Sequence, residues 1–468
     1  MVPTQIVILG GTGDLSKRKL IPALLDLFAR ELLPNTVQII GLARSPWGRE
    51  EYQSFVKDSL QEYHATHEHS DETLEKFCAR LNYVSGSFHD KTSYDRLKNC
   101  LEEFDREEGA HSNRLFYLAV PPRFYADIFS DLKSTGTANE GESAWTHILV
   151  EKPFGHDLKT AQALDSQLAS LYREDQIFRI DHYLAKEAVQ NILSFRFANT
   201  LLQAPWSNES IESVHIKMFE TKDVGSRAGF YEGVGALRDV GQNHLLQLVA
   251  LIAMTQPESF AAEEIRSKRA EVLAALEPID KDRLQTHVLR AQYEGYTGLE
   301  DVSDTSHTET YFELKTELDL PHWSGVPFFI QAGKALGKDE VSITITFKDV
   351  ASGLFETKSC FSVGNQITLT ISPEQTTTVT LNTKSPGLGY QLESQTLSLP
   401  GTVAGPKEIK NSYEKVLFDS IVGDHTLFTR TEEIIAAWKF ITPILDNWHT
   451  LQLHTYTKGS AGPKQTIL

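Results

Sequence analysis

The sequence predicts an α/β protein in which an N-terminal Rossmann-like, doubly wound domain precedes a C-terminal α+β domain with a large, mainly antiparallel sheet. Its 468 residues exceed what one hydrophobic core usually serves. Its first part alternates short apolar runs with amphipathic stretches, and its later part carries β-branched runs of alternating polarity. We expect the first domain to span residues 1–180 and the second to span residues 181–468.

In the first domain, short apolar runs predict strands, and the stretches between them predict helices. The expected strands are QIVILGG, TVQIIGLAR, LNYVSGSF, NRLFYLAV, THILVEKP and QIFRI. The expected helices repeat apolar residues at helical spacing: KLIPALLDLFARELL, EYQSFVKDSLQEYH, SYDRLKNCLEEF and AQALDSQLASLY. Because strands alternate with helices, we expect a parallel sheet that is covered on both faces.

From about Ser210 the pattern changes to alternating, β-branched runs, which are typical of antiparallel strands half exposed to water. These runs are SVHIKMFET, SITITFKD, QITLTISP and TTTVTLNTK. Two long helices are also predicted, in ALRDVGQNHLLQLVALIAM and EEIIAAWKFITPILDNW. The second domain is therefore expected to be of α+β type.

Composition and charge exclude several classes of protein. The formal net charge of −18 argues against general binding to nucleic acid or to an anionic membrane. Cys78, Cys100 and Cys360 are scattered and odd in number, so neither a disulfide framework nor a metal site is expected. No uncharged apolar run is long enough to span a membrane. We expect a cytoplasmic protein without a metal.

A glycine turn follows the first predicted strand, in VILGGTGDLSKRKL, where Gly11, Gly13 and Ser16 have the spacing of a dinucleotide fingerprint. Glycine suits this turn because the backbone must approach a pyrophosphate closely. A bare glycine turn is the alternative, but the strand before it and the helix after it favour a dinucleotide. The expected cofactor contacts are Gly10, Gly11, Thr12, Gly13, Asp14 and Leu15.

The end of the second predicted strand indicates which dinucleotide is bound. NAD sites usually place an acidic residue there, whereas this strand ends in IIGLARS with Arg44. An arginine can pair with a 2′-phosphate, so NADP is favoured and NAD remains a secondary cofactor. The alternative is that Arg44 is a solvated surface side chain.

Two further segments carry candidate chemistry. HILVEKPFG places Lys152 at the end of a predicted strand, where open α/β sheets bind ligands, although a solvated lysine is an alternative. The helix LRDVGQNHLLQ carries Asp239 and His244. His244 could be an ordinary buried histidine, but an imidazole held by a carboxylate is a good base near neutral pH. Asp181, in FRIDHYLAKE, is a candidate for that carboxylate.

Three charged residues beside glycines in the second half are weaker candidates. Glu220 precedes a glycine-containing loop, and Lys334 and Lys338 lie in VPFFIQAGKALGKDE. Charged residues of this kind often only decorate loops.

Taken together, the segments GGTGDLSKRKLIPAL, VEKPFGHD, RIDHYLAKE, ALRDVGQNHLLQ and WSGVPFFIQAGKAL resemble, in this order, the signature segments of glucose-6-phosphate dehydrogenases. The resemblance runs from Ile6 to about Trp448. It implies oxidation of carbon 1 of glucose 6-phosphate to 6-phosphoglucono-1,5-lactone, with hydride transfer to NADP. It also implies a homodimer or homotetramer built on the second domain's sheet.

The resemblance implies roles for individual residues. His244 is the implied general base, and Asp181 orients it. His182, Tyr183 and Lys186 are the implied phosphate ligands. The other implied contacts with the sugar or the reacting region come from Lys152, Glu220, Asp239, Lys334, Lys338 and Lys19, and Lys152 also contacts the cofactor.

The sequence also departs from the family pattern. Ala185 replaces a glycine, Ser372 stands where many relatives carry a substrate-contacting glutamine, and the segment after Lys334 is shortened, which leaves the role of Lys338 open. These departures motivate an alternative substrate, another hexose 6-phosphate. The other alternative is an inactive regulatory relative, which would be free to lose His244 or Asp181, yet both are present.

Overall fold

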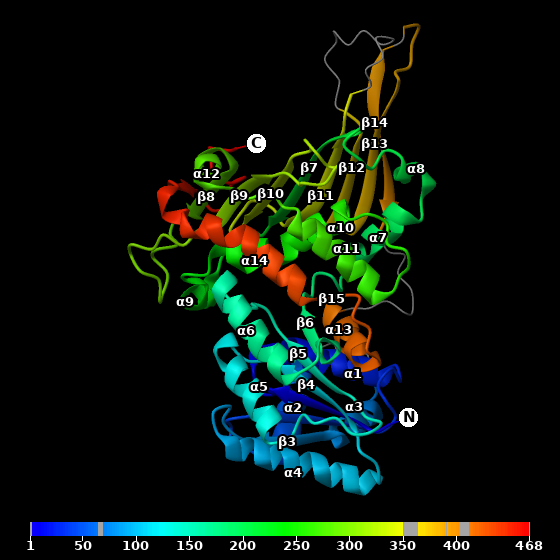
Figure 1. The fold of residues 1–468 in the computed structure, drawn as a ribbon, viewed down its shortest axis with the longest axis vertical. Coiled ribbons are helices and arrows are strands. Elements are labelled where there is room, and N and C mark those ends of the chain that lie inside the picture. Colours follow the sequence, from blue (N-terminus) through cyan, green and yellow to red (C-terminus); the bar gives the residue numbers. More distant parts are fainter. Residues whose placement is uncertain (1, 64–68, 350–363, 390, 402–410, 468) are drawn as a thin grey trace.

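The computed structural model describes residues 2–63, 69–349, 364–389, 391–401 and 411–467, so Cys360 lies outside the described residues. The described chain forms two sheets, one below the other in Figure 1, with helices around the lower sheet and between the two. Across this described part of the chain, no helix has both the length and the apolarity needed to cross a bilayer.

The lower sheet contains all the strands predicted for the first domain. Its order is β15-β6-β5-β4-β1-β2-β3, and only β15 is antiparallel to its neighbour. The strand order reverses between β1 and β4, which is the switch point where doubly wound sheets bind ligands. The bounds are β1 Thr4–Leu9, β2 Val37–Ala43, β3 Leu81–Ser85, β4 Asn113–Leu118, β5 Thr146–Val150, β6 Ile177–Ile180 and β15 Phe428–Thr429.

Helices cover this sheet, and all four predicted ones are present. α3 and α5 were not predicted from the sequence; they have only 9 and 10 residues, so they carry few repeats of the apolar pattern. The bounds are η1 Ser16–Leu20, α1 Ile21–Ala29, α2 Arg49–Tyr63, α3 Asp71–Ala79, α4 Lys91–Glu108, η3 Pro122–Phe124, α5 Tyr125–Ser134, α6 Leu158–Leu171 and η4 Glu174–Gln176.

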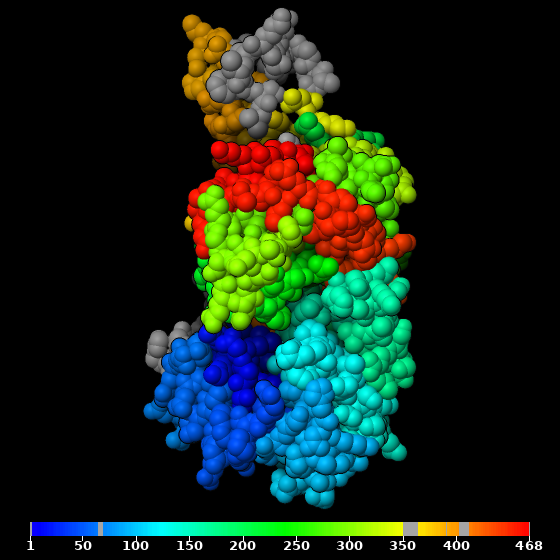
Figure 2. Space-filling model, turned by 90° about the vertical axis from the view of Figure 1, so that its left-hand side faces the viewer, coloured from blue at the N-terminus to red at the C-terminus, as the bar shows by residue number. Residues whose placement is uncertain are grey.

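The upper sheet has nine strands in the order β14-β13-β12-β11-β7-β10-β9-β8-β16. Only the pairs β7–β10 and β8–β16 are parallel. Figure 2 shows β13 and β14 projecting from one end of the molecule. The bounds are β7 Ile211–Phe219, β8 Val288–Tyr293, β9 Tyr311–Thr316, β10 Phe328–Gly333, β11 Glu340–Phe347, β12 Gln366–Ser372, β13 Thr376–Lys384, β14 Leu392–Pro400 and β16 Leu453–Tyr456. The predicted fold class is confirmed.

One face of the upper sheet carries the helices that lie toward the lower sheet (Figure 1). The predicted helix around His244 begins as a π-helical segment, η6, and continues as α10. The bounds are α7 Glu187–Phe197, α8 Thr200–Gln203, η5 Gly225–Arg227, α9 Ala228–Tyr231, η6 Leu237–Leu245, α10 Leu246–Ala253, α11 Ala262–Ala274, α12 Lys281–His287, α13 Ser412–Val422, α14 Thr431–Asp446 and η7 Trp448–Thr450.

The chain returns to the lower sheet late in the sequence. α13 packs against α1, and β15 pairs with the edge strand β6 through Phe428 and Ile180. α14 then packs against both α6 and α11, so it joins helices of the two layers. The division at residue 180 remains a prediction. The two layers are tied together around the end of β6, where the candidate site lies.

Candidate active site

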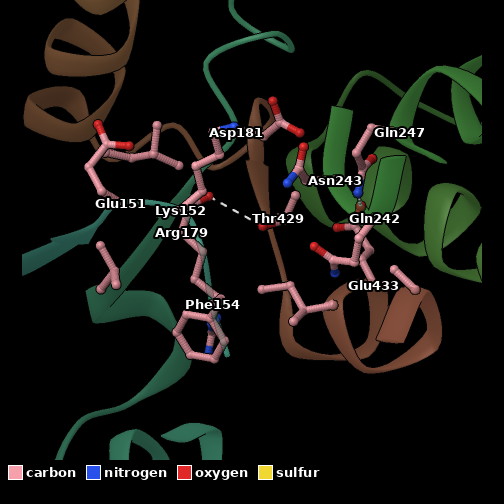
Figure 3. A pocket seen from close by; sticks show the side chains of 14 residues that line it. Glu151, Lys152, Phe154, Arg179, Asp181, Gln242, Asn243, Gln247, Thr429 and Glu433 are labelled. Carbon is pink, nitrogen blue, oxygen red and sulfur yellow. Dashed lines mark hydrogen bonds between the residues drawn. The ribbon is translucent and has the colours of Figure 1, made fainter. Parts of the chain in front are cut away.

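The ends of the lower strands bring several predicted site residues to one edge of the sheet. Lys152 is the second residue after β5, Asp181 directly follows β6, and Arg44 directly follows β2. These strands are parallel, so their carboxyl ends share one edge, where ligands of such sheets bind. Figure 3 shows Lys152 and Asp181 facing side chains of η6, α10 and α14 across a small gap. The structure thus places these predicted residues at one edge of the sheet, and their roles remain predictions.

His244 and Asp181 form a buried hydrogen-bonded pair. His244 Nδ1 lies 2.6 Å from Asp181 Oδ1, and the two residues are 1% and 4% exposed. Burial opposes ionisation of Asp181, but the imidazole outweighs it and lowers the pKa of the carboxyl. Burial lowers the pKa of His244, against the attraction of Asp181. The pair therefore holds a carboxylate beside a neutral imidazole at neutral pH.

The free nitrogen of this imidazole is available for chemistry. Since a carboxylate only accepts hydrogen bonds, Nδ1 of His244 must carry the proton, and Nε2 then has a lone pair. Within the described residues, Nε2 has no hydrogen-bond partner, and His244 lines a cavity of about 640 Å³. A neutral imidazole oriented by a carboxylate beside a cavity has the chemistry that a general base requires.

The π-helical geometry of η6 places two site residues on one side. Asp239 and His244 are five residues apart and both line the cavity. An α-helix repeats every 3.6 residues, whereas the hydrogen bonds of a π-helix join residues five apart. The wider turn therefore lets both side chains reach the same ligand.

Aromatic and cationic groups surround the imidazole. The Tyr183 ring stacks on His244 with centroids 4.3 Å apart, and the Lys186 ammonium lies 3.8 Å from the Tyr183 centroid. His182 meets His244 edge to face and stacks on Tyr413. Burial, followed by the proximity of His244, lowers the pKa of His182 well below its usual value. The side chains of the RIDHYLAKE segment are thus gathered around His244.

A chain of alternating charges crosses the cavity between the two layers. Lys334 Nζ donates to Glu220 Oε2 at 2.6 Å and lies 3.4 Å from Asp239 Oδ2. Lys152 Nζ donates to the Asp239 carbonyl at 2.8 Å and to Oδ1 at 3.3 Å. Burial opposes the charge of Asp239, but Lys152 and Lys334 outweigh it and lower its pKa to about 2. Groups of both signs therefore face the cavity, as a ligand with hydroxyls and a phosphate requires.

The parallel pairing of β7 and β10 sets Glu220 beside Lys334. Phe219 and Gly333 are register partners, so the next residue of each strand emerges at the same edge. A Cβ on Gly333 would lie 2.4 Å from the Tyr311 ring. Ala335 follows with φ of 54°, a left-handed conformation that a non-glycine residue adopts only at a cost. This tight turn holds the Lys334 backbone in place.

The cavity wall also includes residues that sequence reasoning missed. Arg238 is next to Asp239 in the motif ALRDVGQNH, so that motif could have identified it. Tyr413 comes from α13, where no sequence signal links it to the site. Lys186 is not part of the wall itself. Lys19 is exposed on η1, and Lys338 pairs with Glu340, so the structure does not bring these two lysines to the cavity.

The glycine turn after β1 fits a dinucleotide. Gly10 has φ of 93°, and a Cβ there would lie 2.4 Å from the Ala119 carbonyl oxygen. A Cβ on Gly11 would meet the Gly41 backbone at 2.7 Å. Figure 2 shows the surface of the first residues, in dark blue, recessed between the rest of the lower layer and the segment above it. A turn with three glycines at the switch point suits the close approach of a pyrophosphate.

Comparisons with known proteins agree with this geometry. Residues 7–191 match the family model described as "Glucose-6-phosphate dehydrogenase, NAD binding domain", and residues 193–467 match the one described as "Glucose-6-phosphate dehydrogenase, C-terminal domain". The chain belongs to the glucose-6-phosphate dehydrogenase family. The resemblance that the sequence segments suggested is confirmed.

Individual members of the glucose-6-phosphate dehydrogenase family match over nearly the full chain. Glucose-6-phosphate 1-dehydrogenase of Rhizobium meliloti is 37% identical and that of Bacillus subtilis is 36% identical; the matches cover 99% and 98% of this chain and 95% of each relative. The solved structure titled "Glucose-6-phosphate dehydrogenase in complex with its substrate glucose-6-phosphate" superimposes with a TM-score of 0.90 at 36% identity, covering 99% of this chain and 96% of the other. A structure from Mycobacterium avium gives 0.85 at 34% identity, with coverages of 99% and 96%.

The buried histidines of this dehydrogenase predict a loss of stability in mild acid. Burial lowers the pKa of His147 to about 4, below that of a histidine in the unfolded chain. Below about pH 6.5 the unfolded chain therefore binds a proton that the native state does not, so stability falls as the pH falls. At pH 5, His147 alone is expected to account for about 2 kcal/mol of this loss.

Urea unfolding at pH 7 and pH 5 checks this expectation. In the variant His147→Gln, an amide can still donate to the Ser420 carbonyl that the imidazole now contacts. The fall in the free energy of unfolding between pH 7 and pH 5 should then be smaller by about 2 kcal/mol. The matched control His449→Gln alters an exposed histidine and should keep the full loss. An equal loss in all three proteins would contradict the assignment to His147.

Proposed function

We propose that this chain oxidises carbon 1 of β-D-glucose 6-phosphate to 6-phosphoglucono-1,5-lactone with NADP, with His244 as the general base. The observation that carries the proposal is the buried Asp181–His244 pair: His244 Nε2 has no partner among the described residues, and His244 lines a cavity whose wall carries both cations and anions. Its membership of the glucose-6-phosphate dehydrogenase family supports the substrate and the reaction class.

The base removes a single proton. Nε2 of His244 takes the proton of the carbon 1 hydroxyl, and the Asp181 carboxylate stabilises the imidazolium that forms. NADP, when bound, supplies the nicotinamide that accepts the hydride from carbon 1. The base itself then needs only to be held in line, which the hydrogen bond to Asp181 and the stacked Tyr183 ring achieve.

The substrate phosphate is assigned to the cationic side of the cluster. Lys186 lies over the Tyr183 ring beside His182, and this group offers a dianion a local positive charge that the acidic chain as a whole withholds. The sugar hydroxyls are assigned to Glu220, Asp239, Lys152 and Lys334, whose mutual ion pairs leave acceptors and donors at the cavity wall. A substrate would exchange these contacts for its own.

NADP is assigned to the glycine turn and Arg44. The turn residues Gly10 to Leu15 lie at the strand-order switch, and Arg44 is exposed directly after β2, where it can meet a 2′-phosphate. Thr12 and Leu15 are half-buried in this turn and Asp14 is exposed. NAD sites usually have an acidic residue after the second strand, whereas this chain has Arg44 there.

The first test removes the base. His244→Asn keeps a polar side chain of similar size but has no group that titrates near neutral pH, so turnover should fall by about 10²- to 10⁴-fold while glucose 6-phosphate still binds. Formation of reduced nicotinamide measures turnover, with other hexose 6-phosphates assayed in parallel, and calorimetry measures binding. The control His449→Asn, at an exposed histidine, should be unaffected. Near-normal turnover of His244→Asn would refute the assignment.

The second test concerns cofactor choice. Arg44→Ala should raise the KM for NADP by about 10-fold or more and leave the KM for NAD nearly unchanged, because a charge-assisted contact to the 2′-phosphate is lost. The comparison variant Arg106→Ala removes an exposed arginine of α4. Equal effects of Arg44→Ala on both cofactors would show that this arginine does not read the 2′-phosphate.

We further propose that the protein is a cytoplasmic homodimer or homotetramer that associates through the upper sheet. The exposed side chains Leu381, Leu397 and Leu399 lie on β13 and β14, and apolar groups in this position favour a partner surface. Analytical ultracentrifugation of the full chain measures the assembly. A species with the mass of a single chain at micromolar concentration would rule out both assemblies.

A further inference from the structure

Behind the catalytic pair lies a second, much smaller cavity of about 40 Å³. The ends of β5 and β6 form one side of it, and η6, α10 and α14 form the other. Figure 3 shows Glu151 and Lys152 on the strand side and Gln242, Asn243, Gln247 and Glu433 on the helix side, with Asp181 at the rim. Lys152 and Asn243 also line the large cavity, so the two spaces adjoin.

Asp181 has one oxygen that the protein leaves without a donor. Oδ1 accepts from His244 and from the Tyr183 backbone N–H at 3.0 Å. Oδ2 is shut off from the surface, and within the described part of the chain no group donates to it. A buried carboxylate oxygen without a donor is costly, and it weakens the hold on the carboxylate's orientation.

Gln247 has a matching unused acceptor on the opposite wall. Its Nε2 donates to Glu433 Oε2 at 3.0 Å. Since Glu433 is a carboxylate that only accepts hydrogen bonds, the amide cannot be turned round, and its Oε1 must point away from Glu433. Gln247 is 5% exposed, and among the described residues Oε1 has no donor. Two buried acceptors therefore line one small polar cavity.

Glu433 is fixed so firmly that the amide has no freedom to turn. Arg269, only 1% exposed, donates from Nη2 to Glu433 Oε1 at 3.2 Å and places Nε 3.0 Å from Oε2. The Arg430 backbone N–H also donates to Oε1 at 3.0 Å. Arg269 from α11 and the Arg430 backbone beside α14 hold Glu433 as an acceptor, so α11 and α14 together determine which way the Gln247 oxygen points.

We propose that an ordered water molecule in this cavity donates one hydrogen bond to Asp181 Oδ2 and the other to Gln247 Oε1, which makes Gln247 a positioning residue for the catalytic base. Water is the molecule that fits because it carries two donors and about 10 to 15 Å³ suffices for one. The inference rests on the proposed roles of His244 and Asp181. It extends the pair into a chain of hydrogen bonds, called the relay below. The relay runs from His244 through Asp181 and the water to Gln247, Glu433 and Arg269.

The water would matter most when the base is ready to act. In that form the imidazole is neutral, and Asp181 carries a buried negative charge that no proton on His244 Nε2 balances. A donor to Oδ2 stabilises this form more than the protonated one, in which the imidazolium already compensates the carboxylate. Losing the donor should therefore raise the pH at which the enzyme gains activity.

Other titratable groups face the pair and set the background for this effect. On the chain segment of Asp181 itself they are His182, Tyr183 and Lys186; from β5, η6, α13 and α14 they are Glu151, Lys152, Asp239, Tyr413 and Glu433. Of these groups, Glu433 loses the Gln247 donor when Gln247 is replaced, but it keeps Arg269 and the Arg430 backbone N–H as donors. The effect on the pH profile can then be assigned to the relay.

The test replaces Gln247 with methionine, which has a similar length and no hydrogen-bonding amide. The acidic limb of log kcat/KM against pH should move to higher pH by about one unit, the size expected for one hydrogen bond to a charged group. Glucose 6-phosphate affinity at pH 8 should change little, because Gln247 does not line the substrate cavity. An unmoved acidic limb would overturn the proposal, even if turnover or stability declined.

A matched control and a rescue separate the relay from simple loss of packing. Gln331 is also buried and also donates to a glutamate, Glu313, but it lies in β10. Gln331→Met should leave the acidic limb in place. The rescue variant Gln247→Asn keeps an uncharged amide whose oxygen can accept a hydrogen bond from water in the cavity. It should restore the limb part of the way, and a folded Asn variant that behaves like Gln247→Met would count against the relay.

A crystal structure of the full chain gives a readout that does not depend on activity. It should show an ordered water within hydrogen-bonding distance of both Asp181 Oδ2 and Gln247 Oε1, and this water should be absent in Gln247→Met. No ordered water at these two atoms would overturn the proposal while leaving the role of His244 intact. Conversely, full activity of His244→Asn would refute the proposed base whatever the cavity contains.

Discussion

The structure depends on keeping one carboxylate buried, ionised and correctly aimed. Asp181 sits at the end of β6 with 4% of its surface exposed, in an environment that by itself favours the protonated acid. It stays charged because His244 and the backbone of Tyr183 donate to it. Each of these donors comes from a segment whose position the wider fold determines, so the orientation of His244 depends on the packing of the two layers.

The same logic explains why the cavity is lined by ion pairs and not by isolated charges. Lys334 lies between Glu220 and Asp239, and Lys152 holds Asp239 from the other layer. A lone charge in such a place would be neutralised or would bind the wrong ion, whereas a chain of alternating charges keeps each group ionised. A polar substrate can enter by exchanging partners, so the cost of separating the pairs is offset by its own hydroxyls and phosphate. An overall charge of −18 is compatible with an anionic substrate because the cations are local.

Sequence reasoning identified most of the fold and much of the site because both follow local rules. Apolar periodicity correctly predicted the strands β1 to β6 of the lower sheet. The chemistry of imidazole and carboxylate suggested that Asp181 pairs with His244, 63 positions away in the sequence. What it could not supply depends on long-range geometry. The contact of Glu220 with Lys334 requires the parallel register of β7 and β10, and Tyr413 reaches the site only because α13 returns to the first layer. Nothing in the local pattern around either residue encodes those pairings.

The helix that carries His244 begins with the π-helical segment η6, where the α-helical repeat expected from the sequence does not hold. On an α-helical wheel, Asp239 and His244 would point in clearly different directions, and only one could face the ligand. The wider turn of η6 brings both to the cavity. α10 continues directly from it as a buried α-helix that packs on α11. The irregular turn is therefore supported by the regular, buried part of the same helix, which fixes Asp239 and His244 at the cavity wall.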